Sequence, residues 1–285
     1  MIINCQGGRR LKEVVRITRP EEPLVSIITV VLNGERYLEQ TILSVLSQSY
    51  KNIEYIVIDG GSVDRTLDII RKYDDSIDYW QSSEVKGISE KFNIGISLSK
   101  GEVIGIINSD DWYELNCVEE IIKRIKKFDV IHGNLQYWKN EKKEFLFLAN
   151  DKALNVQMTL NHPTVFVKRK LYQDLGIFRE KYRFAMDYEL LLRFYKNKAN
   201  FVYLDMTLAN MRRGGVSDIN WQFGCWEICK AKIENGGNKV TSFLYFLFHL
   251  VRCGTSRLFD RFGLVQVNNF YKKRFSDTKK FILNK

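Results

Sequence analysis

Between Leu24 and Ile107 the chain alternates short apolar runs, rich in β-branched residues, with segments of helical period. The apolar runs are Leu24–Leu32, Ile53–Ile58, Ile77–Trp80 and Val103–Ile107, and the helical segments are Tyr37–Ser47, Val63–Tyr73 and Gly87–Leu98. Strands that alternate with helices form βαβ units and therefore a parallel sheet. Because the runs are apolar nearly throughout, both faces of this sheet are expected to be buried. The sequence thus predicts an α/β fold.

The last of these strands leads directly into Asn108-Ser109-Asp110-Asp111-Trp112. Two adjacent carboxylates therefore stand at the carboxyl end of a buried strand, which is the edge where open α/β sheets bind ligands. Neighbouring carboxylates repel each other, and their hard oxygen atoms suit Mg²⁺ or Mn²⁺, which in turn hold phosphates. The alternative is a strand followed by a helix whose N-terminus the aspartates cap.

After Trp112 the regular alternation stops. Helices are expected over Cys117–Lys127 and Ala185–Tyr195, and strands over Val130–His132, Glu144–Leu148, Thr164–Val167 and Phe201–Leu204. A Gly-rich loop at 212–217 follows, and 218–235 and 241–285 have helical patterns. With 285 residues, the chain is long enough for one large domain and an appendage. We expect an N-terminal extension over 1–23, a main domain over 24–217 and a helical extension over 218–285.

The net charge of +10 favours anionic partners, but much of it lies in the C-terminal segment. Residues 241–285 hold nine Lys or Arg against two Asp, a net charge of +7. The apolar-aromatic run 243–248, followed by these basic residues, is typical of an anchor at an anionic membrane surface. A helical cap folded onto the main domain is equally consistent with this pattern. The longest apolar run there, Phe243–Val251, is shorter than the roughly 20 residues that a membrane span needs.

The five cysteines are scattered, and no two have the spacing of a zinc finger or a redox pair. Cys225 and Cys229 are four residues apart, but no His or Cys pair completes a metal-binding set around them. We therefore expect five reduced thiols in a cytosolic protein. No signal peptide is visible at the N-terminus, which agrees with a cytoplasmic location.

Eight segments occur in a fixed order between residues 24 and 217. They are Ser26–Asn33, Ser44–Tyr50, Ile56–Ser62, Gly101–Ile104, Asn108–Trp112, His162–Phe166, Met186–Glu189 and Gly214–Ser217. The series resembles the GT-A family 2 glycosyltransferases, bacterial enzymes of surface-polysaccharide assembly. The resemblance implies the GT-A fold, with a Rossmann-like, mostly parallel central sheet flanked by helices. It makes residues 24–217 the catalytic domain and leaves a basic helical C-terminal extension outside the match.

The resemblance also implies where a nucleotide would bind. Val30, Leu32, Asn33 and Glu35 follow the first strand and would hold the base and ribose, with Leu32 in place of the usual stacking aromatic residue. Asp59 would accept a hydrogen bond from the ring N–H of uracil, because a carboxylate suits that donor. The alternatives are a turn capped by Asn33 or Glu35 and a plain Asp-Gly turn at Asp59.

Two further segments are expected to contact the donor. Lys86 would meet the diphosphate and Asn93 would lie beside the donor sugar, although a solvated helix start explains Lys86 equally well. The loop after Arg212 would close over the diphosphate, because backbone N–H groups of Gly-rich turns bind anions. Its expected contacts are Arg213, Gly214, Gly215 and Ser217. A linker into the C-terminal segment is the alternative for this loop.

The catalytic groups follow from the same resemblance. Asp111 would bind Mn²⁺ or Mg²⁺ directly and Asp110 would meet the ribose or a metal-bound water, so that the cation stabilises the departing diphosphate. Asp187 would be the general base that deprotonates the acceptor hydroxyl, unless it only caps its helix. Glu189 is disfavoured as the base because a helix turns it away from Asp187. His162 would lie on the acceptor side, or serve as a structural histidine.

Together these expectations describe an inverting, metal-dependent glycosyltransferase. It would move a hexose or N-acetylhexosamine from a UDP-sugar to a sugar hydroxyl of a glycan, with a lipid-diphosphate-linked acceptor for O-antigen or capsule synthesis and peripheral attachment to the inner face of the cell membrane. The alternative is a non-catalytic nucleotide-sugar-binding or scaffolding subunit. Nucleic acid is not an expected partner, because no nucleic-acid-binding motif accompanies the charge. No Gly-x-Gly-x-x-Gly follows the first strand, which disfavours a dehydrogenase.

Overall fold

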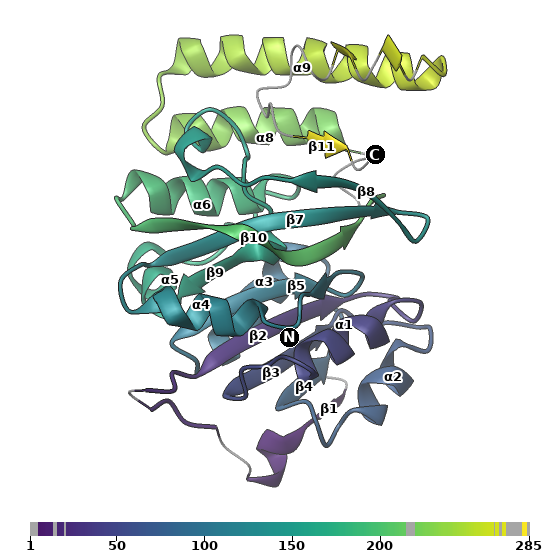
Figure 1. Ribbon diagram of the computed structural model, residues 1–285, viewed down its shortest axis with the longest axis vertical. Coiled ribbons are helices and arrows are strands. Elements are labelled where there is room, and N and C mark those ends of the chain that lie inside the picture. The colour runs from purple at the N-terminus through teal and green to yellow at the C-terminus, as the bar shows by residue number, and fades with distance from the viewer. Residues whose placement is uncertain are drawn as a thin grey trace.

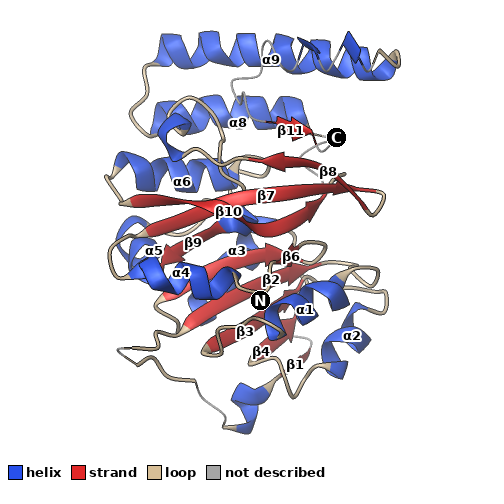
Figure 2. Ribbon diagram, in the orientation of Figure 1, coloured by secondary structure: helices blue, strands red, loops and turns tan. Residues whose placement is uncertain are grey.

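The computed structural model describes residues 5–13, 16–19, 21–214, 220–264, 266–267, 270–271 and 281–283. Its strands belong to one mixed sheet that is flanked by helices (Figures 1 and 2). The strands are β1 (Cys5–Gly7), β2 (Val25–Val31), β3 (Ile53–Asp59), β4 (Tyr79–Ser82), β5 (Val103–Asn108), β6 (Trp112–Tyr113), β7 (Val130–Lys139), β8 (Lys142–Phe147), β9 (Val165–Lys168), β10 (Phe201–Arg212) and β11 (Phe281–Leu283).

The α-helices are α1 (Leu38–Leu46), α2 (Thr66–Lys72), α3 (Ile88–Leu98), α4 (Cys117–Ile125), α5 (Arg169–Leu175), α6 (Met186–Lys196), α8 (Trp221–Glu234) and α9 (Lys239–Arg261). Three short 3-10 helices are η1 (Arg9–Lys12), η2 (Asp151–Ala153) and η3 (His162–Thr164). Among the described residues, no helix is both long enough and apolar enough to cross a membrane.

The main path of the sheet has the strand order β1-β4-β3-β2-β5-β9-β7-β10-β6. Strands β4, β3, β2 and β5 are parallel to their neighbours, as the βαβ pattern predicts. Strands β7 and β10 run in the same direction, whereas β1, β9 and β6 run against it. Six of the nine described strands on this path therefore share one direction, which agrees with the predicted fold class.

The register of the parallel strands brings their carboxyl ends together. Val31 of β2 lies opposite Asp59 of β3, and Val30 lies opposite Asn108 of β5. The loops that follow these three strands therefore leave the sheet at one edge. This edge is where open α/β sheets bind their ligands.

Side chains of a strand alternate between the two faces of a sheet, and each face of this one is covered by its own helices. Ile27 and Val31 belong to the core on the side of α1, α2 and α4, whereas Ile28 and Val30 belong to the core on the side of α3 and α6. Both cores combine aliphatic and aromatic side chains, and the central strands are buried throughout, as their continuous apolar runs predict.

The N-terminal residues extend the sheet, which the sequence pattern did not indicate. Strand β1 pairs antiparallel with β4, at the edge of the sheet. Helix η1 follows β1 in the chain, and its Arg10 forms an ion pair of 2.5 Å with Glu54, whose side chain is 3% exposed. Strand β1 was missed because Cys5-Gln6-Gly7 is too short and too polar to show a strand period.

The C-terminal helices stack outward from the sheet. Helix α8 packs against α6, and α9 packs against α8 (Figure 1). Helix α8 confirms the prediction of helix over 218–235 for residues 221–234, and residues 218–219 lie outside the described part. The prediction of helix over 241–285 is confirmed by α9 as far as Arg261 and is wrong for residues 281–283, which form β11. Strand β11 pairs antiparallel with β8, and β8 in turn pairs with β7 of the main path. Its Phe-Ile-Leu sequence has the aromatic and β-branched character that suits a strand.

Candidate functional site

Two loops at the carboxyl edge of the sheet are joined to each other. The backbone N–H of Asn33 donates to Ser62 Oγ at 2.8 Å, and Asn33 Oδ1 accepts the N–H of Val63 at 3.0 Å. Glu35 Oε2 likewise accepts the N–H of Arg65 at 3.0 Å. Asn33 holds a left-handed backbone with φ of 52°, a conformation that Asn tolerates better than most residues. The predicted base and ribose contacts thus belong to a loop pair fixed by reciprocal hydrogen bonds.

The side chains of Leu32 and Val30 point into different surroundings. Leu32 is 52% exposed on the loop, whereas Val30 is 6% exposed and packs in the core. Leu32 is therefore free to make an apolar contact with a base. A contact from Val30 would have to come from its backbone.

Asp59 is fully buried and holds the turn that follows β3. Its Oδ2 accepts the N–H of Gly61 at 3.1 Å, the N–H of Ser62 at 3.0 Å and the hydroxyl of Ser82 at 2.6 Å. The hydroxyl of Ser62 donates to Oδ1. These four hydrogen bonds hold the turn in place. A direct bond from Asp59 to a uracil ring stays a prediction, and it requires one of these donors to give way.

Lys91 of α3 brings a buried cation to the same turn. Its ammonium nitrogen lies 2.7 Å from the point that a Cβ at Gly60 would occupy, and its side chain is 4% exposed. Burial lowers the pKa of Lys91, and the negative charge of Asp59 partly opposes that shift. Lys86, the residue predicted for the diphosphate, is exposed. In the sequence, Lys91 stands on the apolar face of a predicted helix. Lysines at such positions often bury their aliphatic chain without having a functional role, so the position alone did not indicate a site.

Asp110 and Asp111 follow β5, and Asp111 is the more deeply placed, with 1% exposure. Its Oδ2 accepts a hydrogen bond from the side-chain amide of Asn108 at 3.1 Å, and its Oδ1 accepts one from the backbone N–H of Arg212 at 3.3 Å. Burial raises the pKa of Asp111 well above its usual range, and the charge of Asp110 raises it further. Burial also raises the pKa of Asp110, against the favourable charge of Arg212.

This carboxylate pair fits a divalent cation. A carboxylate has about four lone-pair sites, and the described partners of Asp111 use only one on each oxygen, so oxygen ligands remain. Burial raises the pKa of both carboxyl groups, and a cation beside them would stabilise their ionised forms. Hard oxygen donors of this kind suit Mn²⁺ or Mg²⁺.

Arg212 closes one side of the carboxylate pair. Its guanidinium donates to the carbonyl oxygen of Asp110 at 2.7 Å and to Gln40 Oε1 at 2.7 Å. Its Cζ lies 4.0 Å from the ring centroid of Tyr37 and 4.5 Å from that of Trp112, so the group is held between two aromatic rings. The sequence placed Arg212 in a loop because the strand pattern fades after Leu204, whereas β10 continues to Arg212.

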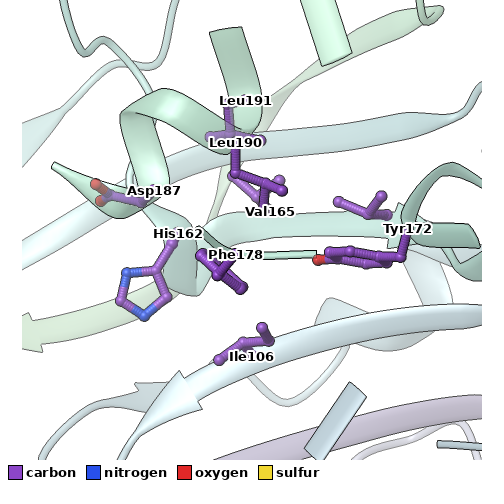
Figure 3. Close-up of a pocket in the computed structure, with 9 residues that line it drawn as sticks. Ile106, His162, Val165, Tyr172, Phe178, Asp187, Leu190 and Leu191 are labelled. Carbon is purple, nitrogen blue, oxygen red and sulfur yellow. The ribbon is translucent and has the colours of Figure 1, made fainter. Parts of the chain in front are cut away.

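Asp187 stands in the first turn of α6 and lines a cavity with mostly apolar walls (Figure 3). Its Oδ1 accepts its neighbour's backbone N–H, from Tyr188, at 2.8 Å. Burial raises the pKa of Asp187 to about 6, and the charge of Glu227 adds to the shift. The cavity is lined by Ile106, His162, Val165, Val167, Tyr172, Phe178, Asp187, Leu190 and Leu191.

His162 and Asp187 both line this cavity (Figure 3). Burial lowers the pKa of His162 to about 4, so the ring is neutral at neutral pH. Its Nε2 is buried and has no hydrogen-bond partner in the described part of the chain. Ile106 lines the same cavity and belongs to β5, the strand that leads to Asp110. The cavity thus connects the α6 carboxylate to the strand that carries the aspartate pair.

Glu227 of α8 holds the backbone that leads into α6. Its carboxylate accepts the N–H groups of Arg183 at 2.9 Å, Phe184 at 2.8 Å and Ala185 at 2.9 Å. A negative group before the first turn of a helix also interacts favourably with the helix dipole. Glu227 was not predicted, because the expected domain boundary at residue 217 separated it from Asp187. Its contact with the segment before Asp187 exists only in the tertiary structure.

Asn93 and Glu189 have structural partners. The side-chain amide of Asn93 bonds both backbone groups of Phe178, at 2.9 and 3.0 Å. Glu189 is fully buried and pairs with Arg193 at 3.1 Å and Arg179 at 3.0 Å. These ion pairs leave Glu189 unsuited to act as a base, as expected, whereas a donor contact of Asn93 stays a prediction.

The Gly-rich loop is only partly described. Arg213 donates to Glu144 Oε1 at 2.8 Å, and Gly214 has a φ of 111° that favours glycine. The predicted contacts Gly215 and Ser217 lie outside the described residues. The role of this loop at a diphosphate stays a prediction.

The family model for glycosyl transferase family 2 matches residues 26–201. An uncharacterized glycosyltransferase of Rickettsia typhi is 30% identical over 198 residues, which are 64% of this chain and 61% of that protein. The chain thus spans less than two thirds of the length of that relative.

Two solved structures share the arrangement of elements. Staphylococcal TarS (S. aureus, residues 1–349) in complex with UDP-GlcNAc has a TM-score of 0.60 and 19% identity, over 78% of this chain and 70% of that one. The mannosyltransferase PcManGT of Pyrobaculum calidifontis in complex with GDP-Man and Mn²⁺ has a TM-score of 0.59 and 14% identity, over 84% of this chain and 74% of that one. At these identities the likeness shows the fold, which is the GT-A fold that the sequence predicts.

Proposed function

The chain belongs to glycosyl transferase family 2, and from this premise we propose that it transfers a sugar from a nucleotide sugar to a hydroxyl group of a glycan. One observation carries the proposal. The cavity that holds Asp187 is lined by β5, and β5 leads to Asp110 and Asp111 at the carboxyl edge of the sheet. This shared strand supports a proposal in which the base on α6 and the cation-binding pair after β5 serve one reaction.

The donor in this proposal is a UDP-sugar that carries a hexose or an N-acetylhexosamine. The linked loops at Asn33 and Glu35 and the rigid turn at Asp59 support a nucleotide site at this edge. TarS, which shares the fold, was solved with UDP-GlcNAc. Lys91 contributes a buried positive charge beside Asp59, where it would face an acceptor atom of the base or an oxygen of the phosphates.

A divalent cation completes the donor site. Asp111, with Asp110 beside it, would hold Mn²⁺ or Mg²⁺, and the bound cation would supply Lewis-acid stabilisation of the leaving diphosphate. PcManGT, with the same fold, was solved with GDP-Man and Mn²⁺. Arg212 would keep the aspartate loop in place from the other side, through its bonds to Asp110 and its contact with Trp112.

Asp187 acts as the general base in this proposal. With a pKa of about 6 it is mostly ionised at neutral pH and still basic enough to accept a proton. It would take the proton of the acceptor hydroxyl while that oxygen attacks the anomeric carbon and the bond to the nucleoside diphosphate breaks. A single displacement of this kind inverts the anomeric configuration. Neutral His162, which lines the same cavity as Asp187, would hydrogen-bond the acceptor sugar through Nε2.

The test is a comparison of Asp187→Asn with Asp68→Asn. Asp68 lies on α2 with a side chain that is 70% exposed, and it serves as the matched control. Both variants should bind UDP in the presence of Mn²⁺, and only Asp187→Asn should lose sugar transfer, by about 10²- to 10⁴-fold. Unchanged transfer in Asp187→Asn would remove Asp187 from the role of base.

A non-catalytic, nucleotide-sugar-binding or scaffolding role is the second candidate. The observation that favours it is the loop residue Leu32, which offers no aromatic face to a base, together with the fully engaged carboxylate of Asp59. Binding of UDP-sugars without release of UDP, across donors and acceptors, would support this role. Turnover that depends on Asp187 and on a divalent cation would exclude it.

We also propose that the acceptor is lipid-linked and that α9 lies on an anionic membrane surface at the inner face of the cell membrane. Large apolar side chains on α9 are exposed: Val240, Phe243, Leu244, Leu247, Phe248, Val251 and Leu258. Arg252, Arg257 and Arg261 belong to the same helix and would meet acidic headgroups. A helix with such a surface can lie in the interface without crossing the bilayer.

A further inference from the structure

Two thiols and an imidazole meet between α8 and α9, far from the aspartates in the chain. Cys225 belongs to α8, and His249 and Cys253 belong to α9. His249 Nδ1 lies 3.2 Å from Cys225 Sγ and 3.3 Å from Cys253 Sγ. The three atoms all lie within 4.8 Å of one another. Among the described residues, no other group of three or more His, Cys, Asp or Glu is arranged to hold a metal ion.

The sequence spacing showed no His or Cys that would complete a set around Cys225, whereas the structure brings His249 and Cys253 to it. His249 and Cys253 are four residues apart on one helix, so their side chains lie on the same face. Cys225 is 24 residues earlier in the chain and reaches them because α8 and α9 pack against each other (Figure 1). No spacing rule within a single segment reveals such a set.

The two distances from His249 Nδ1 to the sulfur atoms are close to those of a metal site. With Zn–S near 2.3 Å and Zn–N near 2.0 Å, tetrahedral angles place neighbouring ligand atoms about 3.5 to 3.8 Å apart. The observed separations of 3.2 and 3.3 Å are slightly shorter, so a cation would require an outward shift of only a few tenths of an ångström. Thiolate and imidazole ligands select soft and borderline cations over Mg²⁺ or Ca²⁺.

We propose that Cys225, His249 and Cys253 bind one Zn²⁺ ion between α8 and α9. The three side chains would occupy three tetrahedral positions and leave the fourth to water or to an added ligand. Cys225 is buried, whereas His249 and Cys253 are partly exposed, so the open position faces the solvent side of the helix pair.

Charge and protons balance in this site. Binding converts two thiols to thiolates and releases two protons, and the two thiolates neutralise the dication. Imidazole would bind through Nδ1, the atom that faces both sulfur atoms, and would carry its proton on Nε2. Arg252 Nη2 lies 2.9 Å from His249 Nε2. Because both nitrogens would then carry protons, the guanidinium would have to turn away when the metal binds.

The metal would fasten α9 to α8, and α8 carries Glu227, which holds the segment before Asp187. The inference does not depend on the proposed transferase activity, because it concerns residues outside the candidate active site. Cys229, on the same helix as Cys225 and also buried, is not a member of the group. The chain thus provides a matched control.

The test uses the full-length reduced protein, freed of metal with a chelator and titrated with Zn²⁺ and with Co²⁺. We expect one equivalent of Co²⁺ to give a sulfur-to-cobalt charge-transfer band, which Zn²⁺ removes. A cation at Asp110 and Asp111 has only oxygen ligands and gives no such band. Cys225→Ser and Cys253→Ser should lose the band or most of its intensity, and His249→Gln should weaken affinity at least about tenfold. Cys229→Ser should behave like the parent protein.

Two results would overturn the proposal. One is the absence of the charge-transfer band in the parent protein at one equivalent of Co²⁺. The other is a loss of affinity in Cys229→Ser as large as that in Cys225→Ser. If the cysteine variants fail to fold, X-ray absorption on the zinc-loaded parent protein decides the matter. A shell of two sulfur atoms and one imidazole nitrogen supports the site, and a shell of oxygen and nitrogen alone rejects it.

Discussion

The carboxylate of Glu227 accepts the backbone N–H of Ala185 at 2.9 Å, two residues before Asp187. The same carboxylate bonds the N–H groups of Arg183 and Phe184, so a helix outside the matched family region fixes the entry to α6. It also places a negative charge close enough to raise the pKa of Asp187. Helix α8 is therefore part of the unit that positions the proposed base, and the predicted domain boundary at residue 217 divides groups that act together.

Changes at Glu227 should act on Asp187 in two separable ways. Glu227→Gln removes the negative charge and keeps one acceptor oxygen, so the pKa of Asp187 should fall and the acid limb of kcat/KM should move to lower pH. Glu227→Ala removes the acceptors as well and should reduce kcat by roughly a hundredfold, because small displacements of a base are costly. Steady-state kinetics from pH 4.5 to 8 check both. A role in stability alone would lower Tm and leave the acid limb unmoved.

The rate of the parent protein should fall as pH falls through about 6, the pKa that burial gives Asp187. The sign follows from the role of base, since protonation removes the accepting lone pair. His162, with a pKa of about 4, stays neutral over this range and should not contribute. Measurement of kcat/KM against pH in the parent protein and in His162→Gln tests this. An acid limb that disappears in His162→Gln would contradict it.

Asp111→Ala should lose the metal-dependent part of UDP affinity. Asp111 is the buried member of the pair, and its ionised form needs a cation for compensation. Isothermal titration of UDP with and without Mn²⁺ measures the difference. Asp174→Ala on α5, whose side chain is 49% exposed, is the control and should keep the full metal effect. Equal affinities with and without Mn²⁺ in the parent protein would refute a metal role for this pair.

Lys91→Met should weaken UDP-sugar binding by about ten- to a hundredfold. A charged hydrogen bond is worth roughly 1.5 to 3 kcal/mol, and methionine preserves the volume of the stem while removing the charge. Lys86→Met, at an exposed site, should change affinity little. Titration of both variants with the same donor compares Lys86, which was predicted from the sequence to contact the donor, with Lys91, which the structure indicates. A larger loss in Lys86→Met would reverse that assignment.

The exposed face of α9 should determine binding to vesicles. A variant with Leu244→Glu and Leu247→Glu adds charge to two side chains that are 58% and 42% exposed, so it should no longer float with anionic liposomes. Val63→Glu changes an equally apolar side chain, 91% exposed, in the loop before α2 and should float like the parent protein. Failure of the parent protein itself to float would argue that α9 only covers the domain.

The periodicity of apolar residues correctly predicted the N-terminal half of the sheet and its helices. The strands and helices from β2 to β5 have strong patterns, and the structure confirms them to within a few residues. Strands β1 and β6 were missed because two or three residues carry no measurable period. The second half of β10 was missed because its register with β7 is irregular between Leu204 and Ala209, where the alternation of side chains breaks.

The same distinction between local pattern and tertiary contact applies to the candidate site. Asp110 and Asp111 were predicted because they follow a recognisable strand, and Asp187 because its segment resembles the family motif. The structure places the first two after β5 and Asp187 in the first turn of α6, while their roles stay predictions. Lys91, Arg212 and Glu227 were not predicted, because their importance arises from partners at long sequence separation. Glu227 meets residues more than 40 positions away, and Arg212 meets Asp110 across 102 positions. Such contacts depend on the packing of the whole domain.

The edge strand β1 has a consequence for any shortened form of the protein. A chain that starts at residue 26, where the family match begins, would lack both β1 and Arg10. The backbone groups of β4 would then lie open as a template for strand pairing between molecules. Glu54 would keep its buried charge without its guanidinium partner, which is strongly destabilising. A chain that starts at residue 26 should therefore self-associate, even though it retains every residue of the proposed active site.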